Sequence, residues 1–164
     1  MELRERWFDD FEVGEEFEIG SHLMTQERIV SFAEEFDPQR FHVDVEAARE
    51  TIYGGLIASG WHTGAVMMKL LATPLGPSSL GSPGGRELKW LAPVRPGDEL
   101  RLRITVLDAN PSTSKPDRGV VVYRNDVLNQ RDQIVMSFES VMLLLRRPGT
   151  AGDPEGLTPP GGPR

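Results

Sequence analysis

The chain contains no cysteine among its 164 residues. It can therefore form no disulfide framework and offers no thiol nucleophile or thiolate metal ligand. It also lacks an apolar run long enough to cross a bilayer, so a membrane is not an expected partner. The first residues, "MELRER", are charged and lack the apolar core of a signal peptide, which makes the cytoplasm the expected location.

Positive charge is scarce as well. The sequence has 18 Lys and Arg against 25 Asp and Glu, a formal net charge of -7 and a pI of about 5.0. Binding to nucleic acid requires clustered Lys and Arg, so we expect no nucleic-acid partner. An acidic protein can still carry a local basic patch for an anionic substrate.

Length and composition predict one globular domain over residues 1–147. Residues 148–164 contain ten Gly or Pro in seventeen positions. This segment has too little apolar surface to offset the entropy of ordering, and we predict a flexible tail there.

The first half of the domain has the spacing of helices. Residues 25–36 place apolar side chains at i, i+3, i+4 and i+7, which predicts an amphipathic helix with Thr25 as its N-cap. Asp44 is expected to cap a second short helix over residues 45–51. Residues 56–73, "LIASGWHTGAVMMKLLAT", are apolar on almost every face, which is typical of a buried helix.

The strands flank these helices in sequence. We expect a first strand within residues 15–25 and four more at 86–94, 98–108, 118–129 and 133–147, with Trp90 in the core. Four successive strands with short links are expected to be antiparallel neighbours, and the buried helix needs an apolar surface around it. The pattern therefore predicts an α+β fold in which an antiparallel sheet wraps around one long central helix. A free sheet edge or helix face would suit pairing with a second copy.

The segment "EEFDPQRFHVD", residues 34–44, carries the candidate catalytic pair, Asp37 and His42. An isolated Asp and His at this spacing are usually a turn and a half-buried imidazole. Here Phe36 and Phe41 supply an apolar wall that would shift the pKa of a histidine beside a carboxylate. Ser59 and Gly60 near the start of the buried helix also offer backbone N–H groups to a developing oxyanion.

Three segments, "FDPQRFHVDVEAA", "YGGLIASGWHTGAVMMKLL" and "LKWLAPVRPGDELRLRITV", resemble the MaoC-like dehydratases, a hotdog-fold family that includes the (R)-specific enoyl-CoA hydratases. The likeness runs from about Phe11 to Arg147. It implies Asp37 and His42 as catalytic residues and Gly60 as the oxyanion-hole residue. Gln39 stands where that family has Asn, and the proline directly follows the aspartate.

The resemblance implies reversible syn hydration of a trans-2-enoyl thioester to a (3R)-hydroxyacyl-CoA. Asp37 and His42 would hold one water, and no metal or separate cofactor is expected because the substrate carries coenzyme A. Ser59, Gln39, Tyr53 and Trp61 are expected around the substrate. The family also implies a homodimer or a larger homo-oligomer.

Two alternative functions stay open at this stage. A thioester hydrolase could use the same scaffold, but it would need a carboxylate on the buried helix, and none lies between Leu56 and Thr73. A non-catalytic acyl-thioester-binding subunit is the other possibility, because Gln39 departs from the family motif.

Overall fold

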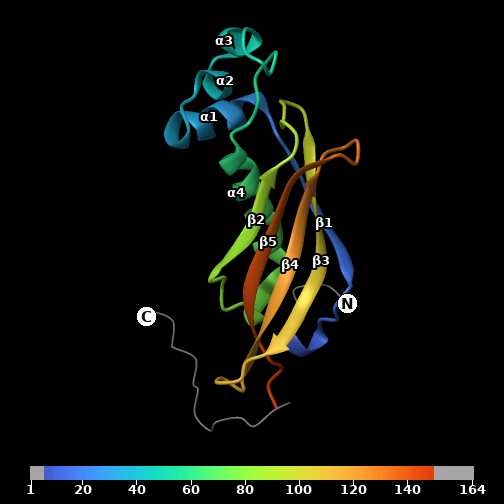
Figure 1. Ribbon diagram of the computed structural model, residues 1–164. Helices are drawn as coiled ribbons and strands as arrows, with labels where there is room; N and C mark the ends of the chain where they lie inside the picture. Colours follow the sequence, from blue (N-terminus) through green and yellow to red (C-terminus); the bar gives the residue numbers. More distant parts are fainter. Residues whose placement is uncertain (1–5, 150–164) are drawn as a thin grey trace.

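The long helix α4 (Gly60–Leu75) lies against one face of a five-stranded sheet in the computed structural model, which describes residues 6–149 (Figure 1). Its buried apolar side chains, among them Val66, Met67 and Leu71, pack against the sheet. The helix begins at Gly60, four residues later than the sequence predicts. Ser59 acts as its N-cap by accepting a hydrogen bond from the N–H of Trp61 at 3.2 Å, so residues 56–59 stay extended.

The sheet consists of β1 (Glu16–Leu23), β2 (Gly84–Trp90), β3 (Glu99–Pro111), β4 (Arg118–Leu128) and β5 (Ile134–Leu145). Every neighbouring pair is antiparallel, and the order is β1-β3-β4-β5-β2. The prediction that all four later strands are successive neighbours is wrong for β2, which pairs with β5. Because β1 occupies the edge of β3, the connection over residues 91–98 carries the chain across the sheet, and β2 becomes an edge strand.

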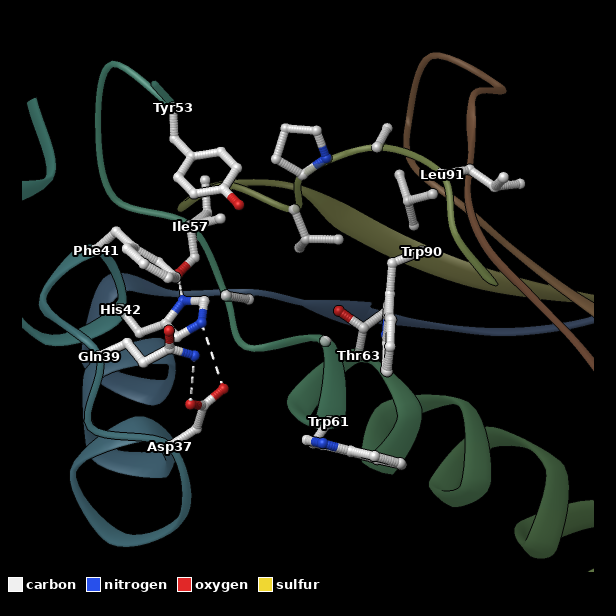
Figure 2. A pocket seen from close by; sticks show the side chains of 16 residues that line it. Asp37, Gln39, Phe41, His42, Tyr53, Ile57, Trp61, Thr63, Trp90 and Leu91 are labelled. Carbon is white, nitrogen blue, oxygen red and sulfur yellow. Dashed lines mark hydrogen bonds and ion pairs between the residues drawn. The ribbon is translucent and has the colours of Figure 1, made fainter. Parts of the chain in front are cut away.

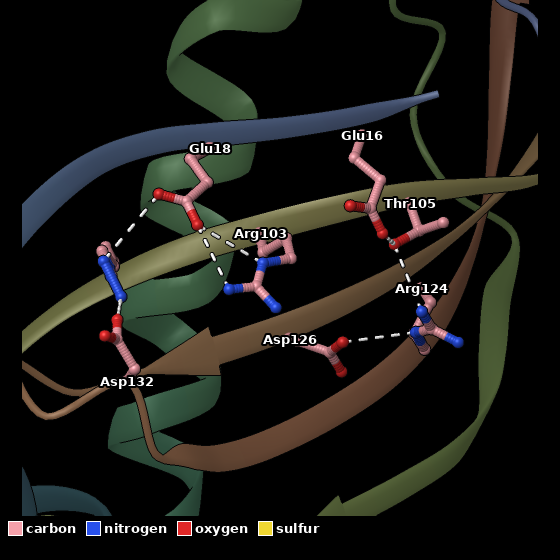
Figure 3. Close-up of polar contacts among 8 residues, drawn as sticks. Glu16, Glu18, Arg103, Thr105, Arg124, Asp126 and Asp132 are labelled. Atoms are coloured by element: carbon pink, nitrogen blue, oxygen red, sulfur yellow. Dashed lines mark hydrogen bonds and ion pairs between the residues drawn. The ribbon is translucent and has the colours of Figure 1, made fainter. Parts of the chain in front are cut away.

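The two faces of the sheet differ as the alternating pattern predicts. Leu100, Leu102, Ile104 and Val106 of β3 are buried beneath α4. The opposite face is polar and ion-paired: Arg103 of β3 contacts Glu18 of β1, and Arg124 contacts Asp126 on β4 (Figure 3). The apolar face therefore fixes the sheet around α4, and the polar face is turned away from the helix.

Three short helices gather at one end of the sheet, where Figure 1 places them above the start of α4. They are α1 (Gln26–Phe36), α2 (Arg40–Val43) and α3 (Val45–Arg49). The predicted caps are confirmed, since Thr25 accepts from the N–H of Arg28 and Asp44 accepts from the N–H groups of Glu46 and Ala47. Single 3₁₀ turns lie at Phe8–Asp10 and Gly76–Ser78.

Within residues 6–149, none of the helices has both the length and the apolar character required to cross a membrane. The predicted flexible tail falls almost entirely outside this described part of the chain.

Candidate active site

Asp37 and His42 meet at the end of α1. Asp37 is the C-cap of this helix: its N–H donates the last helical hydrogen bond to Ala33 O, and its own backbone is no longer helical, while His42 lies in α2. The backbone between them folds back, so that His42 Nε2 lies 3.3 Å from Asp37 Oδ2 (Figure 2). This separation lies well within the span of about 5–6 Å that one shared water can bridge with two hydrogen bonds.

The His42 ring is held in one orientation by a backbone carbonyl. Its Nδ1 lies 2.8 Å from Ile57 O, and a carbonyl oxygen can only accept, so Nδ1 carries the hydrogen. Residue 57 is itself fixed, because Ile57 N–H donates to Phe41 O at 3.1 Å. The buried ring therefore presents Nε2 to Asp37.

The Asp37 carboxylate receives hydrogen bonds on both oxygens. Gln39 Nε2 donates to Oδ1 at 2.8 Å, and Ser59 Oγ donates to Oδ2 at 2.7 Å. Partial burial raises the pKa of Asp37, but these two hydrogen bonds and the neighbouring His42 together outweigh it, so that the pKa lies below its ordinary value of 3.8. The carboxyl group is therefore ionised at neutral pH.

The pair opens onto a cleft of about 520 Å³. The wall beside His42 is aromatic, with the rings of Phe41 and Tyr53 packed 5.1 Å apart. The far side is formed by Trp61 and Trp90, which meet edge to face at 5.4 Å (Figure 2). Asp37 is the only carboxylate among the described residues that line the cleft.

Gly60 lies where the N-terminus of α4 reaches this cleft. A Cβ at this position would come within 2.4 Å of the Trp90 indole, so only glycine permits the observed close approach. The Gly60 N–H makes no hydrogen bond within the described part of the chain. The cleft thus combines a carboxylate, an imidazole and the positive end of a 16-residue helix.

Comparison with known proteins places this arrangement in a family. The sequence profile described as "MaoC like domain" matches residues 10–128, which is most of the chain. The chain belongs to the MaoC-like domain family.

Solved structures agree with this assignment. The MaoC-like dehydratase from Rhodospirillum rubrum is 46% identical with a TM-score of 0.81, and the match covers 87% of this chain and 99% of that one. The R-hydratase PhaJ1 from Pseudomonas aeruginosa is 27% identical with a TM-score of 0.66, covering 86% of each chain. This MaoC-like protein is thus of the hydratase and dehydratase kind.

The hotdog fold is also confirmed. A Mycobacterium tuberculosis protein described as a double hotdog fold has a TM-score of 0.73 at 18% identity, with 93% of this chain and 48% of that chain covered. The expected sheet around a central helix is therefore the architecture of this MaoC-like chain.

The other predicted site residues lie around the same cleft, although not all in the expected role. Gln39, Tyr53, Gly60 and Trp61 line it, whereas the side chain of Ser59 is fully buried and directed to Asp37. Phe36, predicted as part of the apolar wall, is 63% exposed instead, because the helix turns it away from His42. That wall is formed by Phe41 and Tyr53.

Trp90 is a second correction. The sequence predicts it in the core, yet it is 48% exposed because β2 is an edge strand with no neighbour on its outer side. Together with Trp61 it separates the cleft from a smaller, mostly apolar pocket of about 210 Å³. That pocket runs along α4 past Gly64 and Met67 to Phe138 of β5.

Two further residues at the cleft, Thr63 and Arg95, are not among the predicted site residues. Thr63 lines the cleft from α4, and its spacing of three residues from Gly60 is the signal that could have revealed it. Arg95 donates from Nη2 to Tyr53 O at 2.6 Å and so holds the backbone of Tyr53, which lines the cleft. This contact joins residues 42 positions apart, and nothing in the local sequence indicates it.

His62 lies outside the cleft despite its place beside Trp61. Its ring stacks on Phe32 of α1 with centroids 4.5 Å apart. Burial, together with the smaller effects of the nearby His22 and Arg28, lowers the pKa of His62 to about 4. His62 is therefore a neutral packing residue at neutral pH.

Proposed function

We propose that this protein is a hydro-lyase that reversibly adds water to a trans-2-enoyl-CoA thioester and yields a (3R)-hydroxyacyl-CoA. The observation that carries the proposal is the Asp37–His42 pair, 3.3 Å apart and open to a cleft that the N-terminus of α4 also reaches. The family and its R-hydratase neighbour support the same chemistry.

In the proposed reaction Asp37 and His42 together hold one water molecule. The water oxygen adds to C3 of the enoyl group while its proton passes to the pair, and C2 then receives a proton. The thioester itself acidifies C2, so the reaction requires no metal and no redox cofactor.

The negative charge that develops on the thioester oxygen would be stabilised by the Gly60 N–H. This donor lies at the positive end of α4, and removing one such donor typically costs about 2.7–4 kcal/mol of transition-state stabilisation. Because Gly60 and Asp37 line the same cleft, a thioester carbonyl at Gly60 would place C2 and C3 on the side of the catalytic pair.

The acyl chain is proposed to pass Trp61 and Trp90 into the apolar pocket along α4. That pocket begins at Gly60, so it continues from the reacting end of the substrate. Its lining is mostly apolar, with Met67, Met136 and Phe138 at its far side. An alkyl chain would bury apolar surface in this pocket, which favours binding.

We also propose that two copies pair along β2 and α4. Three large apolar side chains are exposed there, since Trp61 is 62%, Met68 42% and Trp90 48% accessible. Sedimentation velocity should give a dimer, which Met68→Glu should weaken.

To test the proposed function, the purified protein is assayed with two substrates. Loss of enoyl-thioester absorbance from crotonyl-CoA measures hydration, and release of free thiol from butyryl-CoA measures hydrolysis. We expect hydration without thiol release, and a longer trans-2-enoyl-CoA shows whether the apolar pocket accepts more of the chain.

The other outcomes separate the two alternatives. Thiol release with unchanged enoyl-CoA would replace the proposal with a thioesterase. Saturable binding of acyl-CoA with neither reaction would identify a non-catalytic acyl-thioester-binding subunit.

A further inference from the structure

Thr63 of α4 presents a buried hydroxyl to the cleft. The residue is only 2% exposed, and it lines the cleft together with Asp37, His42 and Gly60. Figure 2 shows its oxygen turned into the space between the Asp–His pair and Trp90. Among the described residues this hydroxyl has no hydrogen-bond partner. A polar group buried without a partner costs about 1–3 kcal/mol, so a hydroxyl in this position favours a ligand that supplies one.

The usual helical partner of a threonine hydroxyl is already occupied here. A threonine inside a helix can donate to the carbonyl oxygen four residues earlier, which for Thr63 is Ser59 O. That carbonyl already accepts two N–H groups, from His62 at 3.0 Å and from Thr63 itself at 3.2 Å. Both lone pairs of the oxygen are therefore in use, and the Thr63 hydroxyl is available to a group in the cleft.

The position of Thr63 relates it to the reacting end of the substrate. It lies three residues beyond Gly60, about 4.5 Å along the helix, and helical side chains lean back toward the N-terminus. It lines the cleft but not the apolar pocket that begins at Gly60 and runs to Phe138. With the thioester oxygen at Gly60 and C3 at the catalytic pair, the next carbon, C4, passes Thr63 on its way to Trp90.

The charge of the cleft determines which group this hydroxyl can bind. No Lys or Arg is among the described residues that line it, and the Asp37 carboxylate is negative. An anionic substituent would therefore be repelled without a balancing cation. A neutral oxygen can accept the Thr63 hydrogen without that penalty. Most of the other lining side chains are apolar, so a substrate that lacks the oxygen leaves the hydroxyl unpaired.

We propose that Thr63 is a specificity-determining residue that selects acyl-CoA substrates with a neutral oxygen, such as an ether or hydroxyl oxygen, on C4. The Thr63 hydroxyl donates a hydrogen bond to that oxygen when the acyl group fills the cleft. This inference rests on the proposed hydration for the placement of the acyl group, and it deepens that proposal by naming the class of substrate. The reaction at C2 and C3 is unchanged.

The test compares two thioesters that differ in one chain atom. 4-Methoxybutanoyl-CoA has an ether oxygen on C4 where hexanoyl-CoA, of the same length, has a methylene. Isothermal titration calorimetry measures the binding of both to the wild type, to Thr63→Val, which keeps the shape of threonine without its hydroxyl, and to Thr63→Ser, which keeps the hydroxyl. We expect the wild type to bind the ether about tenfold more tightly, Thr63→Val to bind both equally, and Thr63→Ser to restore the preference.

The corresponding enoyl thioesters give a kinetic readout. The wild type should hydrate 4-methoxycrotonyl-CoA with a kcat/KM about tenfold above that for trans-2-hexenoyl-CoA, and Thr63→Val should lose this difference by losing activity toward the ether. An equal loss toward both substrates in Thr63→Val would overturn the inference. The hydroxyl would then act on the thioester that both substrates share.

Tyr53→Phe provides the matched control. Tyr53 carries another cleft hydroxyl that has no hydrogen-bond partner among the described residues, and its ring lies beside Phe41. The preference for the ether should persist in Tyr53→Phe, and a preference that is lost there but kept in Thr63→Val would refute the role of Thr63. Tighter binding of glutaryl-CoA, which has a carboxylate on C4, than of 4-methoxybutanoyl-CoA would refute the choice of a neutral group.

The saturated thioesters bind without reacting, so their binding is measured independently of the proposed function. A protein that prefers 4-methoxybutanoyl-CoA through Thr63 but hydrates neither enoyl thioester would refute the hydratase and leave the specificity role standing. Equal hydration of both enoyl thioesters, with no difference in binding between the saturated pair, would do the reverse.

Discussion

Substitution of Gly60 by alanine is expected to displace Trp90 and destabilise the fold. The new methyl carbon would lie 2.4 Å from Cε2 and Nε1 of the indole, whereas non-bonded carbons prefer about 3.5–4.0 Å. The indole must therefore move by about 1 Å or more. Overpacking of this kind costs about 1–3 kcal/mol, against which alanine gains up to about 1 kcal/mol over glycine in a helix. We expect a net loss of about 1–2 kcal/mol in the free energy of unfolding.

Gly64→Ala provides the matched control within the same helix. A Cβ at Gly64 meets nothing within 4 Å, so this variant should gain about 0.5–1 kcal/mol. Urea unfolding followed by circular dichroism measures both variants, and tryptophan fluorescence reports on the indole. In the double variant Gly60→Ala/Trp90→Ala the penalty of Gly60→Ala should disappear. If Gly60→Ala stabilised the protein as much as Gly64→Ala does, the proposed steric role of glycine at this position would be refuted.

Three further substitutions test other parts of the structure. The pKa of His62, about 4 against an ordinary 6.5, means that protonation favours the unfolded chain, so stability should be full above pH 6.5 and fall toward pH 4 by about 1–3 kcal/mol. Urea unfolding of His62→Phe should show a smaller fall over the same range, and an equal fall would contradict this. Arg95→Met removes the hydrogen bond to Tyr53 O and should raise KM more than it lowers kcat in the crotonyl-CoA assay. Gly119→Ala places a methyl 2.2 Å from the Phe8 ring and should cost about 1–3 kcal/mol in urea unfolding, with Phe8→Leu restoring part of the loss.

Much of the fold could be predicted because local patterns determine it. The alternation of β3 and the caps Thr25 and Asp44 act within a few residues, and the structure has them where the sequence predicts. The position of β2 could not be predicted in this way. Which strand β2 pairs with depends on competition between strands that are far apart in sequence. In this fold β1 pairs with the edge of β3 that β2 was expected to pair with.

The candidate site, too, could be predicted from the sequence only in part. The spacing of Asp37 and His42 alone is typical of an ordinary turn. The neighbouring apolar side chains, the nearby start of the buried helix and the family resemblance together selected the pair. The contact between Ser59 and Asp37 spans 22 positions and depends on how α4 starts beside the end of α1. A serine before a helix normally indicates a cap, so the sequence revealed only one of its two contacts.

The central claim is that Asp37 and His42 act together on water. Its most direct test is the initial rate of crotonyl-CoA hydration by Asp37→Asn relative to wild type, with circular dichroism verifying that the variant is folded. The amide keeps the shape of the carboxylate but not its charge, so the rate should fall about 100-fold or more, as expected when a group of the proton-transfer machinery is lost. A folded Asp37→Asn protein that hydrates crotonyl-CoA at the wild-type rate would contradict the account.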